Sequence, residues 1–227
     1  MSIWSRISEA LSALATGESL SSLFEWLRTP PERTVAFTIA VIALGAKMAK
    51  ADGLVTRDEV AAFREVFTIP AGEEASAAQV FNLARQDVLG FEGYASKIEA
   101  MFRADRQMLI NLLEGMFHIA VADGRYHPAE DDYLHQVSRI FGLDDRCFTS
   151  IRVRFVADAP PDPYAVLGVS PDAPIAELRA VWRQAVIDNH PDRMMARGLP
   201  AEAMAMAEKR LAAINAAWDQ ISRDRAA

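Results

Sequence analysis

Two stretches of this chain align on each other without a gap: AKADGLVTRDE at residues 49–59 and AVADGRYHPAE at residues 120–130. Each contains Ala-Asp-Gly and follows a long run of apolar residues at helical spacing. Asp-Gly is typical of a helix end, because glycine adopts the backbone conformation that stops a helix at little steric cost. A second apolar-periodic segment follows each copy. The repeat therefore predicts two related helical hairpins that bury their long first helices in one core.

Apolar spacing predicts the helices of these hairpins. The first hairpin has a helix over residues 34–51 and a second helix that begins at Thr56, where Glu59 completes a capping box. The second hairpin has its apolar helix over residues 108–119 and ends at Gly142. Three further helices are predicted between and after the copies, over residues 75–88, 94–102 and 144–156. The first two thirds of the chain are thus expected to form an all-α bundle.

Composition and charge narrow the class of protein. The chain has 227 residues, of which 51% are hydrophobic and 24% charged, as in globular proteins with a core. A net charge of −7 argues against nucleic acid as a partner, because proteins that bind it carry a basic face. Cys147 is the only cysteine, which excludes an intramolecular disulfide and a cysteine-based zinc site. This cysteine usage is typical of a reducing compartment, and we expect a cytoplasmic protein.

The first thirty residues predict two short amphipathic helices broken near Thr16-Gly17. Charged residues and serines interrupt the apolar ones, so neither a membrane span nor a secretory signal is expected. The favoured interpretation is that the apolar faces pack on the bundle that follows. The alternative is attachment to a membrane surface or a partner. Acids outnumber bases in this segment, which makes peripheral membrane association the less favoured of the two.

Four acidic residues of the repeat are candidate metal ligands: Asp52 and Glu59 in the first copy, Asp123 and Glu130 in the second. Their spacing matches the second half of an EF-hand loop. The positions of the first half hold side chains without hard oxygen ligands, which excludes an EF-hand: Met48, Lys50, Ile119 and Val121. Two interpretations remain. The acids cap turns and helix starts, or the two pairs lie close together and bind one divalent cation. No other cofactor is expected.

The last third of the chain is organised around NHPDR at residues 189–193. An apolar-periodic helix over residues 175–188 must end there, because Pro191 lacks an N–H and disfavours a helical conformation at the residue before it. A second apolar periodicity begins after Pro200, so we predict a helix, an exposed loop and a helix. The proline-rich segment DAPPDP has the composition of a stiff linker. The predicted division is residues 1–30 for the amphipathic helices, 31–157 for the bundle, 158–163 for the linker and 164–227 for the last domain.

His190-Pro191-Asp192, which we call the tip, suits recognition of a partner better than catalysis. A histidine and an aspartate separated by a rigid proline are expected to point apart, and no serine or cysteine lies nearby in the sequence to act as nucleophile. The same residues offer a donor, acceptors and a charge on a fixed backbone. The chain is therefore not expected to be an enzyme.

His190-Pro191-Asp192 in this position resembles the motif of a J domain, and the resemblance has two further parts. Residues 162–169, DPYAVLGV, are similar to the first helix of that family, and residues 214–218, INAAW, to the end of its third. The paired Ala-Asp-Gly hairpins resemble the TerB-like fold. The two together resemble the DjlA-like group of DnaJ proteins, which usually begins with a membrane-spanning helix. This chain departs from that pattern.

The resemblance implies a co-chaperone. In the J-domain family the tripeptide engages a DnaK-type heat-shock chaperone and stimulates its ATPase, and Arg179 and Arg183 occupy positions that are usually basic. Arg193 adds charge after the tip. From Asp162 onward the chain has eight Lys and Arg against nine Asp and Glu, so any electrostatic attraction is local to this face. The TerB-like domain is expected to recruit a client or partner.

Two rival functions remain open. In the first, the chain is a TerB-like stress-response or metal-sensing protein, and the J-like segment is an accessory interaction module. In the second, it is a hydrolase that uses the acidic pairs on a metal. Stimulation of a chaperone ATPase by the wild-type chain distinguishes the co-chaperone hypothesis from both.

Overall fold

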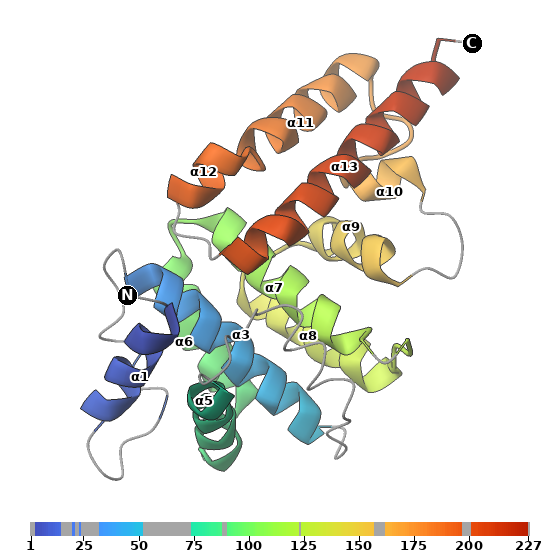
Figure 1. The fold of residues 1–227 in the computed structure, drawn as a ribbon. Coiled ribbons are helices and arrows are strands. Elements are labelled where there is room, and N and C mark those ends of the chain that lie inside the picture. The colour runs from blue at the N-terminus through green and yellow to red at the C-terminus, as the bar shows by residue number, and fades with distance from the viewer. Residues whose placement is uncertain are drawn as a thin grey trace.

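The computed structural model describes residues 3–14, 20, 23, 32–51, 74–87, 90–122, 124–156, 162–196 and 201–226. Every regular element in these ranges is a helix (Figure 1). In chain order they are α1 (Ile3–Ala13), α3 (Glu32–Ala51), α5 (Glu74–Gln86), α6 (Phe91–Phe102), α7 (Arg106–Ala120), α8 (Pro128–Ile140), α9 (Asp145–Phe155), α10 (Pro163–Leu167), α11 (Ile175–Asp188), α12 (Pro191–Ala196) and α13 (Ala201–Asp224). The all-α prediction is confirmed for the described part of the chain.

The two long apolar helices, α3 and α7, lie against each other at the centre of the first two thirds. Nearly every described side chain of α3 is buried, and α7 is buried along most of its length. A helix that is apolar all round is stable only when other elements cover it on all sides, and here α5, α6 and α8 contact α3. The predicted common core of the two long helices is confirmed.

The amphipathic helix α1 covers another part of this core. Trp4, Ile7 and Leu11 are buried, and α1 contacts both α3 and α5. Ser8 Oγ lies 2.6 Å from Ser76 Oγ of α5. The packing interpretation is confirmed for α1, whereas most of the second predicted helix lies outside the described residues. None of the described helices has the length and apolar character needed to cross a membrane.

The second hairpin consists of α7 and α8. Gly124, in the turn between them, has a φ of 77°, in the left-handed region that favours glycine. Pro128 opens α8, and the backbone N–H of His127 donates to Glu130 Oε2 at 2.8 Å. The loop and second helix predicted for the first hairpin lie outside the described residues, so its likeness to the second hairpin stays a prediction.

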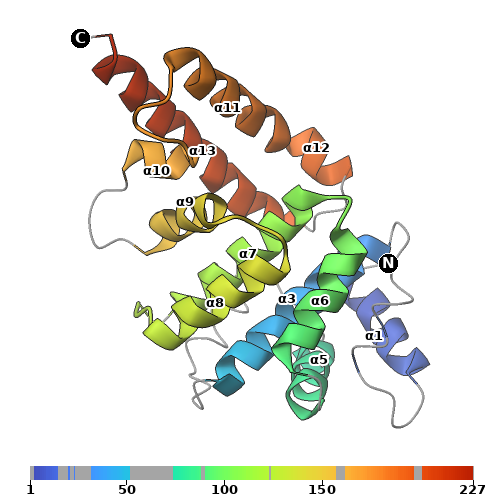
Figure 2. The ribbon, with the colours of Figure 1, turned by 180° about the vertical axis from the view of Figure 1, so that it is seen from behind.

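The last third of the chain is built on α11 and α13, which run side by side in both views (Figures 1 and 2). Their contact includes Trp182 and Trp218, whose rings stack with centroids 5.1 Å apart. The short helix α10 lies between α9 and α13. Asp162 accepts from the N–H of Tyr164 at 3.1 Å and Pro163 is the first residue of α10, so two residues of the predicted linker belong to this helix start.

The exposed loop predicted between α11 and α13 is wrong in part, because residues Pro191–Ala196 form the short helix α12. Pro191 ends α11, but a proline also suits the first turn of a helix, where its missing N–H needs no partner. Met194 of α12 is fully buried in the same core as α3 and α7, while Met195 is 61% exposed. The tip therefore rests on the first two thirds of the molecule.

Candidate functional site

The tripeptide His190-Pro191-Asp192 lies at the junction of α11 and α12. The helix α11 ends at Asn189, whose backbone N–H donates to Ala185 O at 3.1 Å. The side chains of His190 and Asp192 are 57% and 81% exposed. The structure thus presents both polar groups to solvent at one end of the α11–α13 pair.

The prediction that His190 and Asp192 point apart is wrong. His190 Nδ1 lies 3.3 Å from the backbone N of Asp192 and accepts its N–H, and it lies 3.7 Å from the Asp192 carboxylate. Pro191 starts a helical turn, which brings Asp192 back toward the imidazole. The tip is therefore a compact unit in which the position of one polar group depends on the other.

The three arginines predicted to support the tip have different surroundings. Arg179 and Arg183 are exposed on α11, one helical turn apart, so they share a face. The Arg179 guanidinium lies 5.9 Å from the ring of Trp218 on α13. Arg193 follows the tip and pairs with Asp188, with 3.3 Å between Nη1 and Oδ1.

The acidic residue Asp188 is a departure from the basic pattern expected next to the tip. Its second oxygen accepts from Gln184 Nε2 at 2.9 Å, in addition to the pairing with Arg193. These two contacts partly offset the negative charge of the carboxylate. The charge of Asp188 is therefore partly neutralised within the chain itself.

A buried polar cluster lies directly beneath the tip, and sequence reasoning missed it. Asn189, which precedes His190, accepts from Arg210 Nε of α13 at 2.6 Å. Arg210 Nη2 donates to Asn111 Oδ1 of α7 at 2.7 Å, and Nη1 donates to Glu114 Oε2 of the same helix. Arg154 Nη1 of α9 lies 2.5 Å from Glu114 Oε1. Between 1% and 5% of the surface of Asn111, Glu114, Asn189 and Arg210 is exposed.

Glu114 is ionised in this cluster. Burial by itself raises the pKa of a carboxyl group, but the guanidiniums of Arg154 and Arg210 outweigh that effect and hold the pKa of Glu114 below its ordinary value. One signal in the sequence could have located this residue. Glu114 is the single charged position in the apolar run over residues 108–117, and a buried charge requires a partner.

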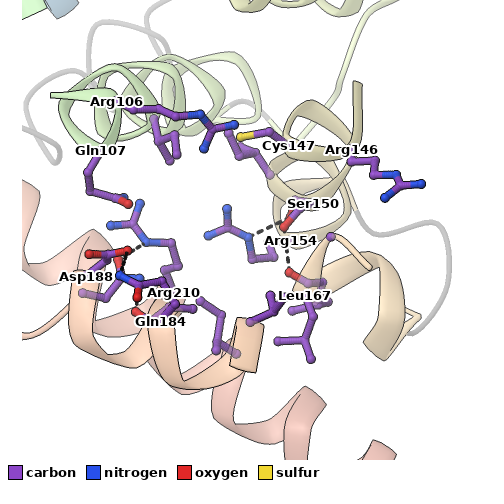
Figure 3. A pocket seen from close by; sticks show the side chains of 18 of the residues that line it. Arg106, Gln107, Arg146, Cys147, Ser150, Arg154, Leu167, Gln184, Asp188 and Arg210 are labelled. Carbon is purple, nitrogen blue, oxygen red and sulfur yellow. Dashed lines mark hydrogen bonds between the residues drawn. The ribbon is translucent and has the colours of Figure 1, made fainter. Parts of the chain in front are cut away.

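A cavity of about 430 Å³ lies beside this cluster, between α7 and α9 on one side and α11 and α13 on the other (Figure 3). Arg106, Cys147, Arg154 and Arg210 are among the residues that line it. Burial raises the pKa of the Cys147 thiol, and the nearby Arg106 guanidinium opposes this shift. Figure 3 shows Arg106 directed toward Cys147. The last third of the chain and the first two thirds thus line an open, partly polar pocket between them.

The acidic candidates for a metal site are described only at Glu130. Its Oε2 accepts from the His127 backbone and the residue is 4% exposed, which fits the capping interpretation for this position. Asp52, Glu59 and Asp123 lie outside the described residues. No group of three or more His, Cys, Asp or Glu within the described ranges has the arrangement of a metal site. The divalent cation hypothesis stays a prediction.

Comparison with known proteins identifies the helical bundle that carries Asn111, Glu114 and Arg154. The family model described as tellurite resistance protein TerB matches residues 38–153, which include α5 to α8 and most of α3 and α9. The chain belongs to the TerB family. The buried cluster therefore joins the TerB region to the segment that carries His190-Pro191-Asp192.

The chain is also similar over most of its length to proteins named co-chaperone protein DjlA. That of Photobacterium profundum is 27% identical over 220 residues, which cover 86% of this chain and 79% of that protein. That of Vibrio parahaemolyticus is 25% identical over 224 residues, 85% of this chain and 79% of that protein. The protein of that name from Coxiella burnetii is 27% identical over 201 residues, which cover 78% of this chain and 73% of that protein. No solved structure matches the chain significantly.

Proposed function

We propose that this protein is a co-chaperone that stimulates the ATPase of a DnaK-type heat-shock chaperone through His190, Pro191 and Asp192. The observation that carries the proposal is the exposed tripeptide between α11 and α12, in a chain similar to proteins named co-chaperones. The chain itself performs no covalent chemistry in this proposal. It binds the partner and changes the rate of the partner's reaction.

Each part of the tip has a role in this proposal. His190 and Asp192 contact the chaperone, and Pro191 fixes the backbone between them. The exposed guanidiniums of Arg179 and Arg183 attract an acidic surface on the partner, and Arg193 orients Asp188 away from that surface by pairing with it. The TerB region recruits a client or a second partner and brings it close to the chaperone.

The decisive experiment is the steady-state ATPase of a purified DnaK-type chaperone, titrated with the full chain and its variants. We expect the wild-type chain to stimulate the ATPase and His190→Gln to abolish stimulation at every concentration. The side chain of His190 is 57% exposed and its substitution leaves the core untouched, so the helical circular dichroism spectrum of the variant is expected to match that of the wild type.

The matched control is His127→Gln, the same chemical change at an exposed position. His127 lies at the start of α8, where the backbone rather than the imidazole makes the hydrogen bond to Glu130. This variant is expected to stimulate as the wild type does. A wild-type chain that gives no stimulation at any concentration contradicts the proposed function.

The TerB family match supports one rival, a stress-response or metal-sensing protein in which the last third is an accessory module. The same titration separates the two hypotheses. The rival predicts that the wild-type chain leaves the chaperone ATPase unchanged, and that His190→Gln and His127→Gln are indistinguishable from it.

A further inference from the structure

The residue that precedes the tip is held at both ends of its side-chain amide. Asn189 Nδ2 donates to Ala185 O at 2.7 Å, and Asn189 Oδ1 accepts from Arg210 Nε at 2.6 Å. Only 5% of the surface of Asn189 is exposed, whereas His190, the next residue, is largely exposed. The backbone that leads into the exposed tip is therefore anchored by a buried side chain.

Arg210 connects this anchor to the TerB region. Its guanidinium uses Nε for Asn189 and its two terminal nitrogens for Glu114 and Asn111 on α7. The guanidinium is a rigid planar fork, so the direction of Nε is set by the position in which α7 holds the other two nitrogens. A displacement of α7 relative to α13 must therefore displace the donor that Asn189 requires.

We propose that Glu114, Arg210 and Asn189 form a positioning network through which the TerB region fixes the conformation of His190-Pro191-Asp192. The consequence for chaperone stimulation rests on the proposed function, whereas the coupling between α7 and the tip does not. All three are positioning residues, because none is exposed enough to contact a partner. His190-Pro191-Asp192 takes this conformation only when the TerB region and the last third of the chain are docked on each other.

The buried charges of Glu114, Arg154 and Arg210 add little to the stability of the fold compared with apolar packing. Stability alone therefore does not account for the cluster, which favours a positioning role. Well-packed apolar residues often replace a buried Arg-Glu-Arg cluster without loss of stability, while removal of one partner leaves an uncompensated buried charge. Here the cluster consists of Arg154, Glu114 and Arg210, and Arg210 Nε, which makes no contact with Glu114, donates to Asn189. Hydrogen bonds are directional, whereas apolar contacts are not. The hydrogen bond from Arg210 therefore fixes the orientation of the Asn189 side-chain amide.

The test measures amide hydrogen exchange at the tip by NMR in the full chain. The reporters are the amide protons of His190 and Met194, which donate to Ile187 O and His190 O at 3.4 and 3.1 Å. We expect Asn189→Ala to speed their exchange about tenfold, the factor that corresponds to loss of one charge-assisted hydrogen bond. Asn189→Asp keeps the acceptor for Arg210 but loses the donor to Ala185 O, so its exchange is expected to lie between that of the wild type and that of Asn189→Ala.

A substitution in the other region tests the coupling itself. Glu114→Gln is expected to speed exchange at His190 and Met194 although it lies on α7, and Arg210→Lys, which keeps a charge but loses the fork, is expected to do the same. The matched control is Glu99→Gln, which removes the exposed pair with Arg103 on α6 and leaves exchange at the tip unchanged. If Glu114→Gln does not fold, Arg210→Lys and the two Asn189 variants still decide the question.

The ATPase titration gives the functional readout. A mispositioned tip binds less often in the productive conformation, so Asn189→Ala is expected to raise the concentration for half-maximal stimulation at least about fivefold with little change in the maximum. Unchanged exchange in Asn189→Ala, or equal exchange in Asn189→Ala and Asn189→Asp, overturns the proposal. If exchange follows the prediction but the wild-type chain never stimulates the ATPase, the proposed function fails and the positioning network stands.

Discussion

Glu114 is the residue at which buried ion pairs join the two regions. It lies in the middle of α7, 1% exposed, with a guanidinium from α9 on one oxygen and one from α13 on the other. A carboxylate in this position is stabilised only while both guanidiniums are present. The single charge in the apolar run over residues 108–117 is therefore the point at which ion pairs join α7, α9 and α13.

The pH dependence of unfolding follows from the lowered pKa of Glu114. In the folded chain this pKa lies below the value of about 4.3 that an unfolded glutamate has, so between the two the unfolded chain binds more protons. The stabilisation is complete above that range and is lost as the pH falls toward the folded pKa. We expect the free energy of unfolding in urea to fall steeply below about pH 4.3.

The comparison variant for this prediction is Glu114→Leu with Arg154→Met and Arg210→Met, which replaces all three charges by apolar groups of similar size. Its free energy of unfolding is expected to fall less steeply over the same pH range, because it lacks the ionised carboxylate. Parallel pH profiles of the two proteins would contradict the assignment of this acid sensitivity to Glu114.

The helix α11 has two faces with different roles. Its apolar side chains face α13, where Leu178 is buried and Trp182 Nε1 donates to Asn215 Oδ1 at 2.9 Å. Of the two exposed arginines, Arg179 lies over the ring of Trp218 on α13, whereas Arg183 is one turn further along the solvent side. The charge of Arg183 can therefore be changed with the least effect on the packing of the helix pair.

Charge reversal on this face tests electrostatic attraction of the chaperone. Arg183→Glu is expected to raise the concentration for half-maximal ATPase stimulation about fivefold at low salt and less at high salt, because salt screens exposed charges. The control is Arg103→Glu at the residue after α6, which changes the net charge by the same amount and disrupts an exposed ion pair with Glu99. An equal effect of the two reversals would indicate that overall charge, and not this face, governs the encounter.

At the scale of the whole molecule, the last third of the chain has an apolar cluster of its own, around Leu178, Trp218 and Ile221, and it also contributes to the core of the first two thirds. Met194 of α12 and Ala207 of α13 are buried in the same apolar cluster as the long helices α3 and α7. The charged cluster at Glu114 lies at the same junction. Since neither region keeps its buried surface when the other leaves, we expect them to unfold together.

This expectation is tested by urea unfolding of a Trp4→Phe/Trp26→Phe variant, in which Trp182 and Trp218 report the last third by fluorescence. Far-UV circular dichroism reports all helices. The two curves are expected to coincide, and Met194→Ala is expected to lower the free energy of unfolding by about 2–5 kcal/mol in both. Met195→Ala, at the exposed neighbouring position, serves as the control and is expected to change it by less than about 0.5 kcal/mol. Two separate transitions would contradict a shared core.

The sequence by itself determined the two long central helices and the place where α11 ends, immediately before His190. Apolar spacing places the long helices α3 and α7, and the asparagine and proline around His190 place the end of α11, because these signals act within a few residues. The chemistry available at the tip follows from the residue types alone. The metal hypothesis at Asp52, Glu59 and Asp123 stays a prediction from spacing.

Only the tertiary structure decided what supports the tip. Glu114 and Arg210 are separated by 96 residues, and nothing in local spacing pairs them. The burial of Met194 depends equally on where α12 rests on the first two thirds of the molecule. The physical reason is that periodicity indicates which face of a helix is buried, whereas a buried charge or amide takes its role from the partner that the fold brings to it.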